Sequence, residues 1–141
     1  MWRHFEFMKK TRRQIAREKA IIGIYQNLLV QSTYDDILNY LKEEPILQEN
    51  KQALMFSSWL VDTTLKNKES YIQLLSRYLK TDWTFQRLGV MEQAILLIAT
   101  CELLESDLPK KIVVNEAIIN AKAFCDDDSY KFINGILGKI A

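Results

Sequence analysis

An all-α fold is the class that this sequence predicts, and three observations lead to it. Only four glycines and two prolines interrupt its 141 residues. Apolar residues recur at intervals of three and four in nearly every window, as they do on one face of an α-helix. The hydrophobic content of 48% is enough to bury one core at this length. We therefore expect about seven helices in a single domain over residues 10–141, after an N-terminal extension at residues 1–9.

The first predicted helix spans residues 10–31. Its apolar side consists of Ile15, Ala16, Ala20, Ile24 and Leu28. Lys10, Arg13 and Arg17 follow another side at helical spacing and form a cationic stripe, with Arg12 beside it. The chain before Ala20 carries seven Lys or Arg against two acids, although the whole chain has a net charge of only +1. The stripe predicts either a polyanionic partner or a solvated helix end, and charge alone leaves both open.

Three further helices are expected in the first half of the chain. The second begins after Thr33 and ends before Pro45, because the residue that precedes a proline avoids the α region. The third and fourth cover residues 51–66 and 69–80. We interpret the segment Glu43–Asn50 between the second and third helices as a short connector.

A second connector and three more helices complete the prediction. Residues 80–87 form this connector, in which Trp83 and Phe85 should pack back against the helices. The helix from Leu88 to Leu104 is the most apolar and should be the buried, central one. The buried stripes of the last two helices are expected to be Val114, Ala117, Ile118 and Ala121, and then Ile133, Ile136, Leu137 and Ile140.

Enzyme and metal chemistry find little support in the residues. The single histidine, His4, lies near the N-terminus, and neither GxxxxGK[ST] nor GxGxxG occurs. Cys101 and Cys125 show no metal-ligand spacing, and the run Asp126 to Asp128 is expected to cap the last helix and to meet solvent. The longest apolar stretch, AILLIA, is far shorter than the roughly 20 residues of a membrane-spanning helix. We therefore predict a cytoplasmic protein that is not an enzyme and has no cofactor, metal or membrane contact.

Two residues of the last predicted helix are not explained by its buried stripe. Phe132 is turned by about 100° from Ile133, which places an aromatic ring at the rim of the core. Single-stranded RNA is bound by exposed rings beside cations, but a ring at a core edge is also common without that role. Gly135 stands in mid-helix at a cost of about 1 kcal/mol relative to alanine. The close approach of another backbone would explain it.

Three segments resemble the signature of NusB, a family of bacterial transcription antitermination factors. The C-terminal segment LPKKIVVNEAIINAKAFCDDDSYKFINGILGKI contains Asn-Glu-Ala at 115–117 and Lys-Phe-Ile-Asn-Gly at 131–135, in the order that the family has them. RRQIAREKAIIGIYQ is similar to the family's arginine-rich opening, and RLGVMEQAILLIATCEL to one of its central helices. The resemblance covers residues 10–141. Gln14, where the family commonly has an arginine, and the spacing around residues 79–87 depart from it.

The resemblance implies a fold of two packed helical subdomains and a role in transcription. Members of the family bind the boxA element of nascent ribosomal RNA leaders together with NusE, which is also a protein of the small ribosomal subunit. The pair joins other Nus factors on RNA polymerase, suppresses termination and assists rRNA maturation. The expected partners of this chain are therefore single-stranded boxA-like RNA, NusE, the other Nus factors and RNA polymerase.

The resemblance also implies roles for individual residues. It assigns RNA binding to Arg12, Arg13, Arg17, Tyr78, Lys131 and Phe132, and the cationic stripe adds Lys10 to these expected RNA-binding residues. The surface expected to face NusE consists of Tyr25, Glu92 and Asp128. Another class of function stays open beside this one. The domain could be a protein-interaction module or a homodimer without specific RNA binding, and a size measurement with and without RNA would separate these alternatives.

Overall fold

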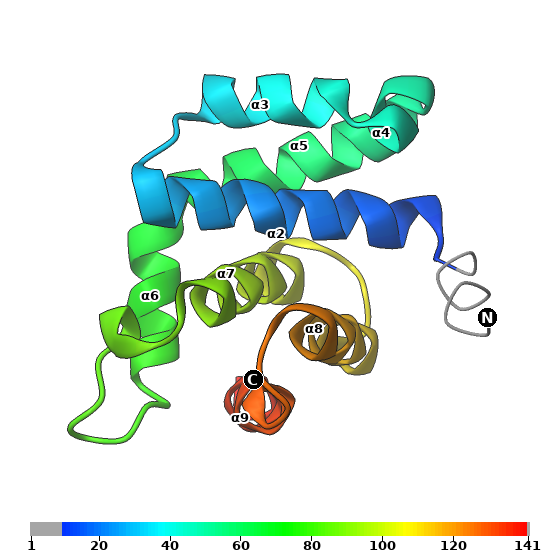
Figure 1. Ribbon diagram of the computed structural model, residues 1–141. Helices are drawn as coiled ribbons and strands as arrows, with labels where there is room; N and C mark the ends of the chain where they lie inside the picture. Colours follow the sequence, from blue (N-terminus) through cyan, green and yellow to red (C-terminus); the bar gives the residue numbers. More distant parts are fainter. Residues whose placement is uncertain (1–9, 141) are drawn as a thin grey trace.

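The computed structural model describes residues 10–140, and every regular element in this part of the chain is helical (Figure 1). The α-helices are α2 (Arg12–Val30), α3 (Tyr34–Glu43), α4 (Pro45–Glu49), α5 (Lys51–Lys66), α6 (Lys68–Ser76), α7 (Val90–Glu105), α8 (Lys110–Phe124) and α9 (Ser129–Leu137). A 3₁₀ turn, η1 (Phe85–Arg87), precedes α7. Residues 1–9, with His4 and the predicted N-terminal extension, and Ala141 lie outside the described residues.

The all-α prediction is confirmed, and the described residues hold one α-helix more than the predicted seven. The additional helix is α4, within the segment that was expected to be a connector. It begins at Pro45, whose fixed φ suits the first helical position. It has only five residues, too few for a hydrophobic period to show. The bounds of α5 agree with the prediction, whereas α6 ends at Ser76, before the expected residue 80.

Side-chain caps fix where the first two helices begin. The Thr11 hydroxyl accepts the N–H of Gln14 at 3.0 Å, and the Gln14 side chain accepts the N–H of Thr11 at 3.0 Å. Thr33 and Asp36 repeat this capping box at the start of α3. Such a box satisfies backbone donors that have no partner within the helix. The cap at Thr11 therefore places Arg12 in the first turn of α2.

Helix α2 lies in the middle of the molecule. In Figure 1, α3 and α5 lie on one side of it, while α7, followed by α8 and α9, lies on the other. The packing on the first side is tight, because a Cβ at Gly23 would lie 2.5 Å from Ile37 Cγ2 on α3. On α5, the buried Ser57 hydroxyl donates to the carbonyl of Ala16 at 2.8 Å. Small residues thus hold α2 close to its neighbours.

The central position predicted for the most apolar helix is confirmed. Every residue of α7 from Gln93 to Glu102 is buried. The predicted stripe of α9 is also confirmed, since all four of its residues are buried. The stripe of α8 is confirmed at Ala117 and Ala121 but is wrong at Val114 and Ile118, which are only half-buried, while Val113 and Asn120 are buried instead. None of the helices formed by the described residues has the length and hydropathy needed to cross a membrane.

The connector before α7 behaves differently at its two aromatic residues. Phe85, in η1, is buried with 1% exposure and packs into the core as predicted. Trp83 has an exposed fraction of 44%, so the prediction that it packs back is wrong. The segment is too irregular to have a period, and the sequence therefore carried no signal for which of the two rings turns inward.

Candidate nucleic-acid interface

Arg17 does not belong to an exposed stripe. Its guanidinium is buried, and it donates to both carboxylate oxygens of Glu102 on α7, from Nε at 2.6 Å and from Nη2 at 3.0 Å. Nη1 donates to Glu116 on α8 at 3.1 Å. The predicted cationic stripe is therefore wrong at this position. A helical wheel shows spacing within one helix but not the acids that other helices bring to it.

The same carboxylate binds the residue that departs from the family pattern. Gln14 Nε2 lies 3.2 Å from each oxygen of Glu116. Gln14 thus caps α2 and also ties the start of this helix to α8. Glu116, the glutamate of the Asn-Glu-Ala motif, thus accepts hydrogen bonds from both Gln14 and Arg17 and links α8 to α2.

The other cations of the stripe lie at the exposed start of α2. Arg12 and Arg13 are exposed and line a pocket of about 180 Å³ together with residues of α5. The guanidinium carbon of Arg13 lies 3.8 Å from the ring centroid of Phe56, a cation–π contact that orients this side chain. Lys10 forms an ion pair with Glu18 at 3.0 Å.

A groove of about 580 Å³ lies between α9 and the segment that precedes α7. We call it the aromatic groove. Its aromatic and cationic lining residues are Tyr78, Lys80, Trp83, Arg87, Lys131, Phe132 and Lys139. The rim position predicted for Phe132 is confirmed, because its ring is 36% exposed. The groove thus brings together Tyr78, Lys131 and Phe132 from the predicted site, whereas Arg12 and Arg13 lie outside it.

Gly135 also lines the aromatic groove. Apart from its two chain neighbours and the nearby backbone of α9 itself, no described atom lies within 4 Å of a Cβ at this position. The expectation that another backbone approaches Gly135 closely is therefore wrong. The sequence analysis did not identify Trp83 and Arg87 as lining residues, because the connector that carries Trp83 is irregular and has no period that would bring the two side chains together.

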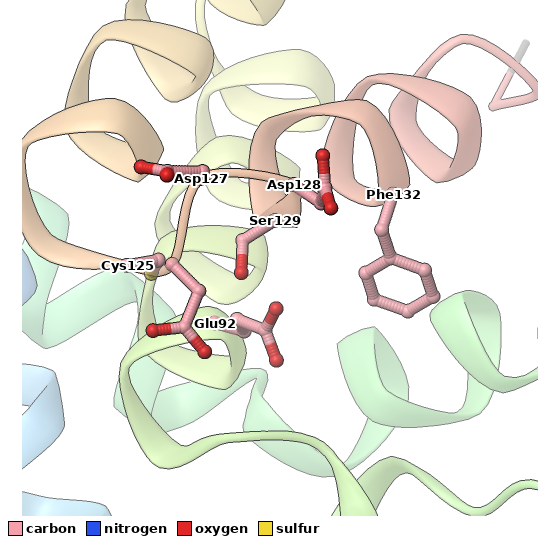
Figure 2. A pocket seen from close by; sticks show the side chains of 7 residues that line it. Glu92, Cys125, Asp127, Asp128, Ser129 and Phe132 are labelled. Atoms are coloured by element: carbon pink, nitrogen blue, oxygen red, sulfur yellow. The ribbon is translucent and has the colours of Figure 1, made fainter.

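An acidic hollow of about 760 Å³ adjoins the groove (Figure 2). Its lining residues are Glu92, Cys125, Asp126, Asp127, Asp128, Ser129 and Phe132. Figure 2 shows Glu92 on α7 facing the loop that carries the aspartates, with Phe132 beside them on α9. Glu92 and Phe132 line both the hollow and the groove. The two concave sites therefore share a wall.

Among the described residues, Asp128 is the acid of the hollow that forms an ion pair. Asp128 occupies the N-cap position of α9, but its side chain makes no capping hydrogen bond, contrary to the predicted role. It forms an exposed pair with Lys131 at 3.5 Å. Glu92 Oε1 accepts the N–H of Gly89 at 3.1 Å and so caps α7. Tyr25, the third residue predicted to face NusE, lies half-buried on α2 and is not among the residues that line the hollow.

The two cysteines are poorly suited to nucleophilic chemistry. Burial raises the pKa of the Cys101 thiol to about 11. The pKa of Cys125 is also raised to about 11, chiefly by burial and in addition by the nearby carboxylates of Glu92 and Asp126. Both thiols are therefore protonated near neutral pH. Among the described residues, no group of three or more His, Cys, Asp or Glu is arranged to hold a metal ion.

Comparisons with known proteins agree with the resemblance seen in the motifs. Residues 14–141 match the NusB family. A transcription antitermination protein NusB from Staphylococcus haemolyticus is 41% identical over 133 residues, covering 89% of this chain and 99% of that protein. The NusB of Staphylococcus aureus is 36% identical over 128 residues, covering 89% of this chain and 98% of that protein.

Solved structures share the fold. The structure of T. maritima NusB superposes with a TM-score of 0.80 at 33% identity, covering 92% of this chain and 90% of that chain. A crystal structure of the antitermination factors NusB and NusE in complex with double-stranded RNA matches with a TM-score of 0.77 at 26% identity. It covers 90% of this chain and 93% of the matched chain.

Proposed function

The chain belongs to the NusB family, and from this premise we propose that it is a transcription antitermination factor that binds boxA-type RNA of nascent rRNA transcripts together with NusE. In this role it supports antitermination by RNA polymerase, with the other Nus factors, and rRNA maturation. It acts in the cytoplasm and catalyses no reaction. Helix α2 packs against α5, and α7 packs against α8 and α9. These two groups of contacts support an organisation in two helical subdomains.

The observation that carries this proposal is the aromatic groove. It combines exposed or half-exposed rings at Tyr78 and Phe132 with the cation of Lys131. Unpaired bases stack on such rings, because every base has a π face, and nearby cations neutralise the backbone phosphates. A duplex hides these faces. We therefore expect single-stranded RNA to be the ligand of the groove.

The start of α2 supplies a second group of cations at some distance from the groove. Arg12 and Arg13 are exposed there, and Lys10 lies immediately before the helix. We assign to them contacts with phosphates, which position RNA without reading its sequence. Arg17 takes another role, because its guanidinium is already bound to Glu102 and Glu116. It positions the helix that presents the other arginines.

The acidic hollow supports a binding surface for NusE. Proteins of the ribosome are generally basic, and a cationic segment complements the carboxylates of Glu92 and Asp128. Tyr25 is proposed to extend this surface along α2. Because the hollow and the groove share Phe132, NusE and RNA would lie side by side on the protein.

The proposal is tested by fluorescence anisotropy of a labelled boxA-like RNA, titrated with the protein alone and with NusE at two salt concentrations. A scrambled RNA and a double-stranded RNA serve as controls. We expect preference for the single-stranded boxA-like RNA and tighter binding when NusE is present. Equal binding to all three RNAs, with or without NusE, would contradict the proposal. A size measurement under the same conditions would then test the homodimer.

A further inference from the structure

Trp83 is exposed in a way that packing does not explain. Of the two aromatic residues in the connector, Phe85 is buried, whereas Trp83 keeps 44% of its surface accessible. Arg87 lies over the indole, with its guanidinium carbon 4.5 Å from the ring centroid. The same guanidinium donates to the carbonyl of Asp82 at 3.2 Å. The indole is therefore held in a defined position at the edge of the aromatic groove, with a cation over one face.

Gly135 is a second feature without a packing reason. Glycine is the poorest helix former after proline, and Gly135 lies within α9. Space is available for a side chain, since no described atom apart from the nearby backbone of α9 itself and the two chain neighbours lies within 4 Å of a Cβ placed there. Phe132 precedes Gly135 by three positions, so these two residues share one side of α9, and Lys139 lies in the turn that follows the helix. All three line the aromatic groove.

These two unexplained features lie in the same groove as the proposed RNA site. Its lining residues include the cations of Lys80, Arg87, Lys131 and Lys139, against one carboxylate at Glu92. An aromatic surface with this excess of positive charge suits a chain of bases and phosphates. A neutral or basic peptide would find no complementary charge apart from Glu92.

We propose that the aromatic groove binds a second nucleotide beyond the one stacked on Phe132, with its base on the free face of Trp83. Arg87 keeps the indole in position and neutralises the adjoining phosphate. The missing side chain at Gly135 leaves the space through which the RNA passes between Phe132 and Trp83. This inference rests on the proposed RNA-binding function and adds Trp83, Arg87 and Gly135 to its site.

Substitutions at Gly135 separate this role from a structural one. Gly135→Ala and Gly135→Leu should leave the protein equally stable or more stable, because both residues favour the helix and the space is open. The same variants should bind boxA-like RNA more weakly, with Leu the stronger effect. Increased thermal stability together with weaker RNA binding is a result that a merely structural glycine would not give. Unchanged affinity of the Leu variant would overturn the inference.

Trp83 has a control of similar exposure outside the groove. Leu104 on α7 is 46% exposed and is not among the residues that line the groove. Trp83→Ala should reduce RNA affinity about tenfold or more, as expected for the loss of one stacked base, while Trp83→Phe should retain part of the affinity. Leu104→Ala should leave it unchanged, because Leu104 lines neither the groove nor the pocket of Arg12 and Arg13. Equal affinities of the two alanine variants would also overturn the inference.

Two readouts test the second nucleotide directly. When the RNA is shortened stepwise from either end, the affinities of the wild type and Trp83→Ala should become equal once the nucleotide held by Trp83 is removed. In a Trp2→Phe/Trp59→Phe protein, where Trp83 is the remaining tryptophan, its emission should be quenched by saturating RNA. Emission that does not change at saturation would exclude stacking on Trp83.

Phe132→Ala distinguishes failure of this inference from failure of the proposed function. If Phe132→Ala weakens RNA binding while the Trp83 and Gly135 variants bind normally, the RNA site stands and the second nucleotide is rejected. If Phe132→Ala and the Trp83 and Gly135 variants all bind like the wild type, the groove is not the RNA site, and both proposals fail.

Discussion

The side chains of Arg17 and Glu102 form a buried, two-pronged ion pair between α2 and α7, with donor-to-acceptor distances of 2.6 Å and 3.0 Å. Only 5% of the arginine side chain and 1% of the glutamate side chain are exposed. Glu116 completes the arrangement from α8. Since α2 also begins with the exposed Arg12 and Arg13, this pair fixes the orientation of the helix end that we expect to meet RNA.

Substitution of Arg17 should therefore lower the stability of the protein. Arg17→Met is expected to lower the free energy of unfolding by about 3–5 kcal/mol, because it leaves Glu102 buried without its partner. Arg17→Met/Glu102→Leu should recover much of this loss, since no charge is then left uncompensated at that contact. Urea denaturation of both variants measures the difference.

An exposed ion pair provides the control for Arg17. Lys66 pairs with Asp62 at 3.0 Å on the surface of α5, and Lys66→Met should cost less than about 1 kcal/mol. If Arg17→Met is no more destabilising than Lys66→Met, the buried pair does not hold α2 in place.

Arg17 also shows what the sequence could and could not predict. The period of apolar residues located α5 at its observed bounds and identified α7 as the central helix, because both signals lie within one element. Burial of Arg17 depends on carboxylates that are 85 and 99 positions further along the chain. No local pattern contains that information, so the wheel placed Arg17 beside Arg13.

The candidate site was predictable to the same degree. The rim position of Phe132 follows from its angle to Ile133 within α9, and the structure confirms it. Phe132 and Trp83 line the same groove only because the irregular connector before α7 folds against α9. The sequence contained a tryptophan and an arginine there but no period, and it predicted burial for the ring that is exposed.

Arg13 should contribute to RNA binding through its charge. Its side chain is exposed and oriented by Phe56, so Arg13→Gln removes one phosphate contact without disturbing the core. The slope of log affinity against log salt concentration should decrease in magnitude by about 0.7 to 0.9. Lys66→Gln removes a charge from another part of the molecule and should leave the slope unchanged. Equal slopes for all three proteins would contradict the assignment of Arg13.

Phe132 should contribute through stacking and not through charge. Phe132→Ala is expected to weaken RNA binding by about 1–3 kcal/mol at every salt concentration, with an unchanged slope. Ile112→Ala is a suitable control, because Ile112 is an exposed apolar residue on α8 that lies outside the groove. Thermal melting should separate lost binding from lost stability, since the ring of Phe132 is partly exposed and its removal should disturb the core little. A steeper or flatter salt dependence in Phe132→Ala would contradict a stacking role.

Cys125 should report on occupation of the acidic hollow. Its pKa is raised to about 11, chiefly by burial, so the reactive thiolate is scarce at pH 8. Alkylation of Cys125 should therefore accelerate about tenfold for each pH unit up to pH 10. Cys101 is fully buried and should react only when the protein unfolds.

NusE provides the second arm of the thiol experiment. If it covers the hollow, NusE should protect Cys125 from alkylation in the folded protein, with mass spectrometry identifying the labelled residue. A Cys101→Ser variant gives the signal of Cys125 alone. Labelling of Cys125 at the same rate with and without bound NusE would place NusE elsewhere.

Glu92 should couple the two binding partners, because its carboxylate lines both the aromatic groove and the acidic hollow. In the groove it opposes the phosphates of RNA, and in the hollow it attracts a cationic segment of NusE. Glu92→Gln should therefore strengthen RNA binding by the protein alone and weaken NusE binding. It should also weaken the coupling between the partners: bound NusE should raise the affinity for RNA by a smaller factor than in the wild type. Because coupling is reciprocal, RNA should raise the affinity for NusE by the same reduced factor.

The design of this variant keeps the fold intact. A glutamine at position 92 can still accept the N–H of Gly89 through its amide oxygen, so the start of α7 is preserved. Asp127→Asn is the matched control, because Asp127 lines the hollow but not the groove. It should weaken NusE binding with little effect on RNA alone. For each variant, titrations of RNA with and without saturating NusE, and of NusE with and without saturating RNA, measure the four affinities. Identical RNA affinities for Glu92→Gln and Asp127→Asn would show that the carboxylate of Glu92 does not repel RNA in the groove, and the predicted coupling would be rejected.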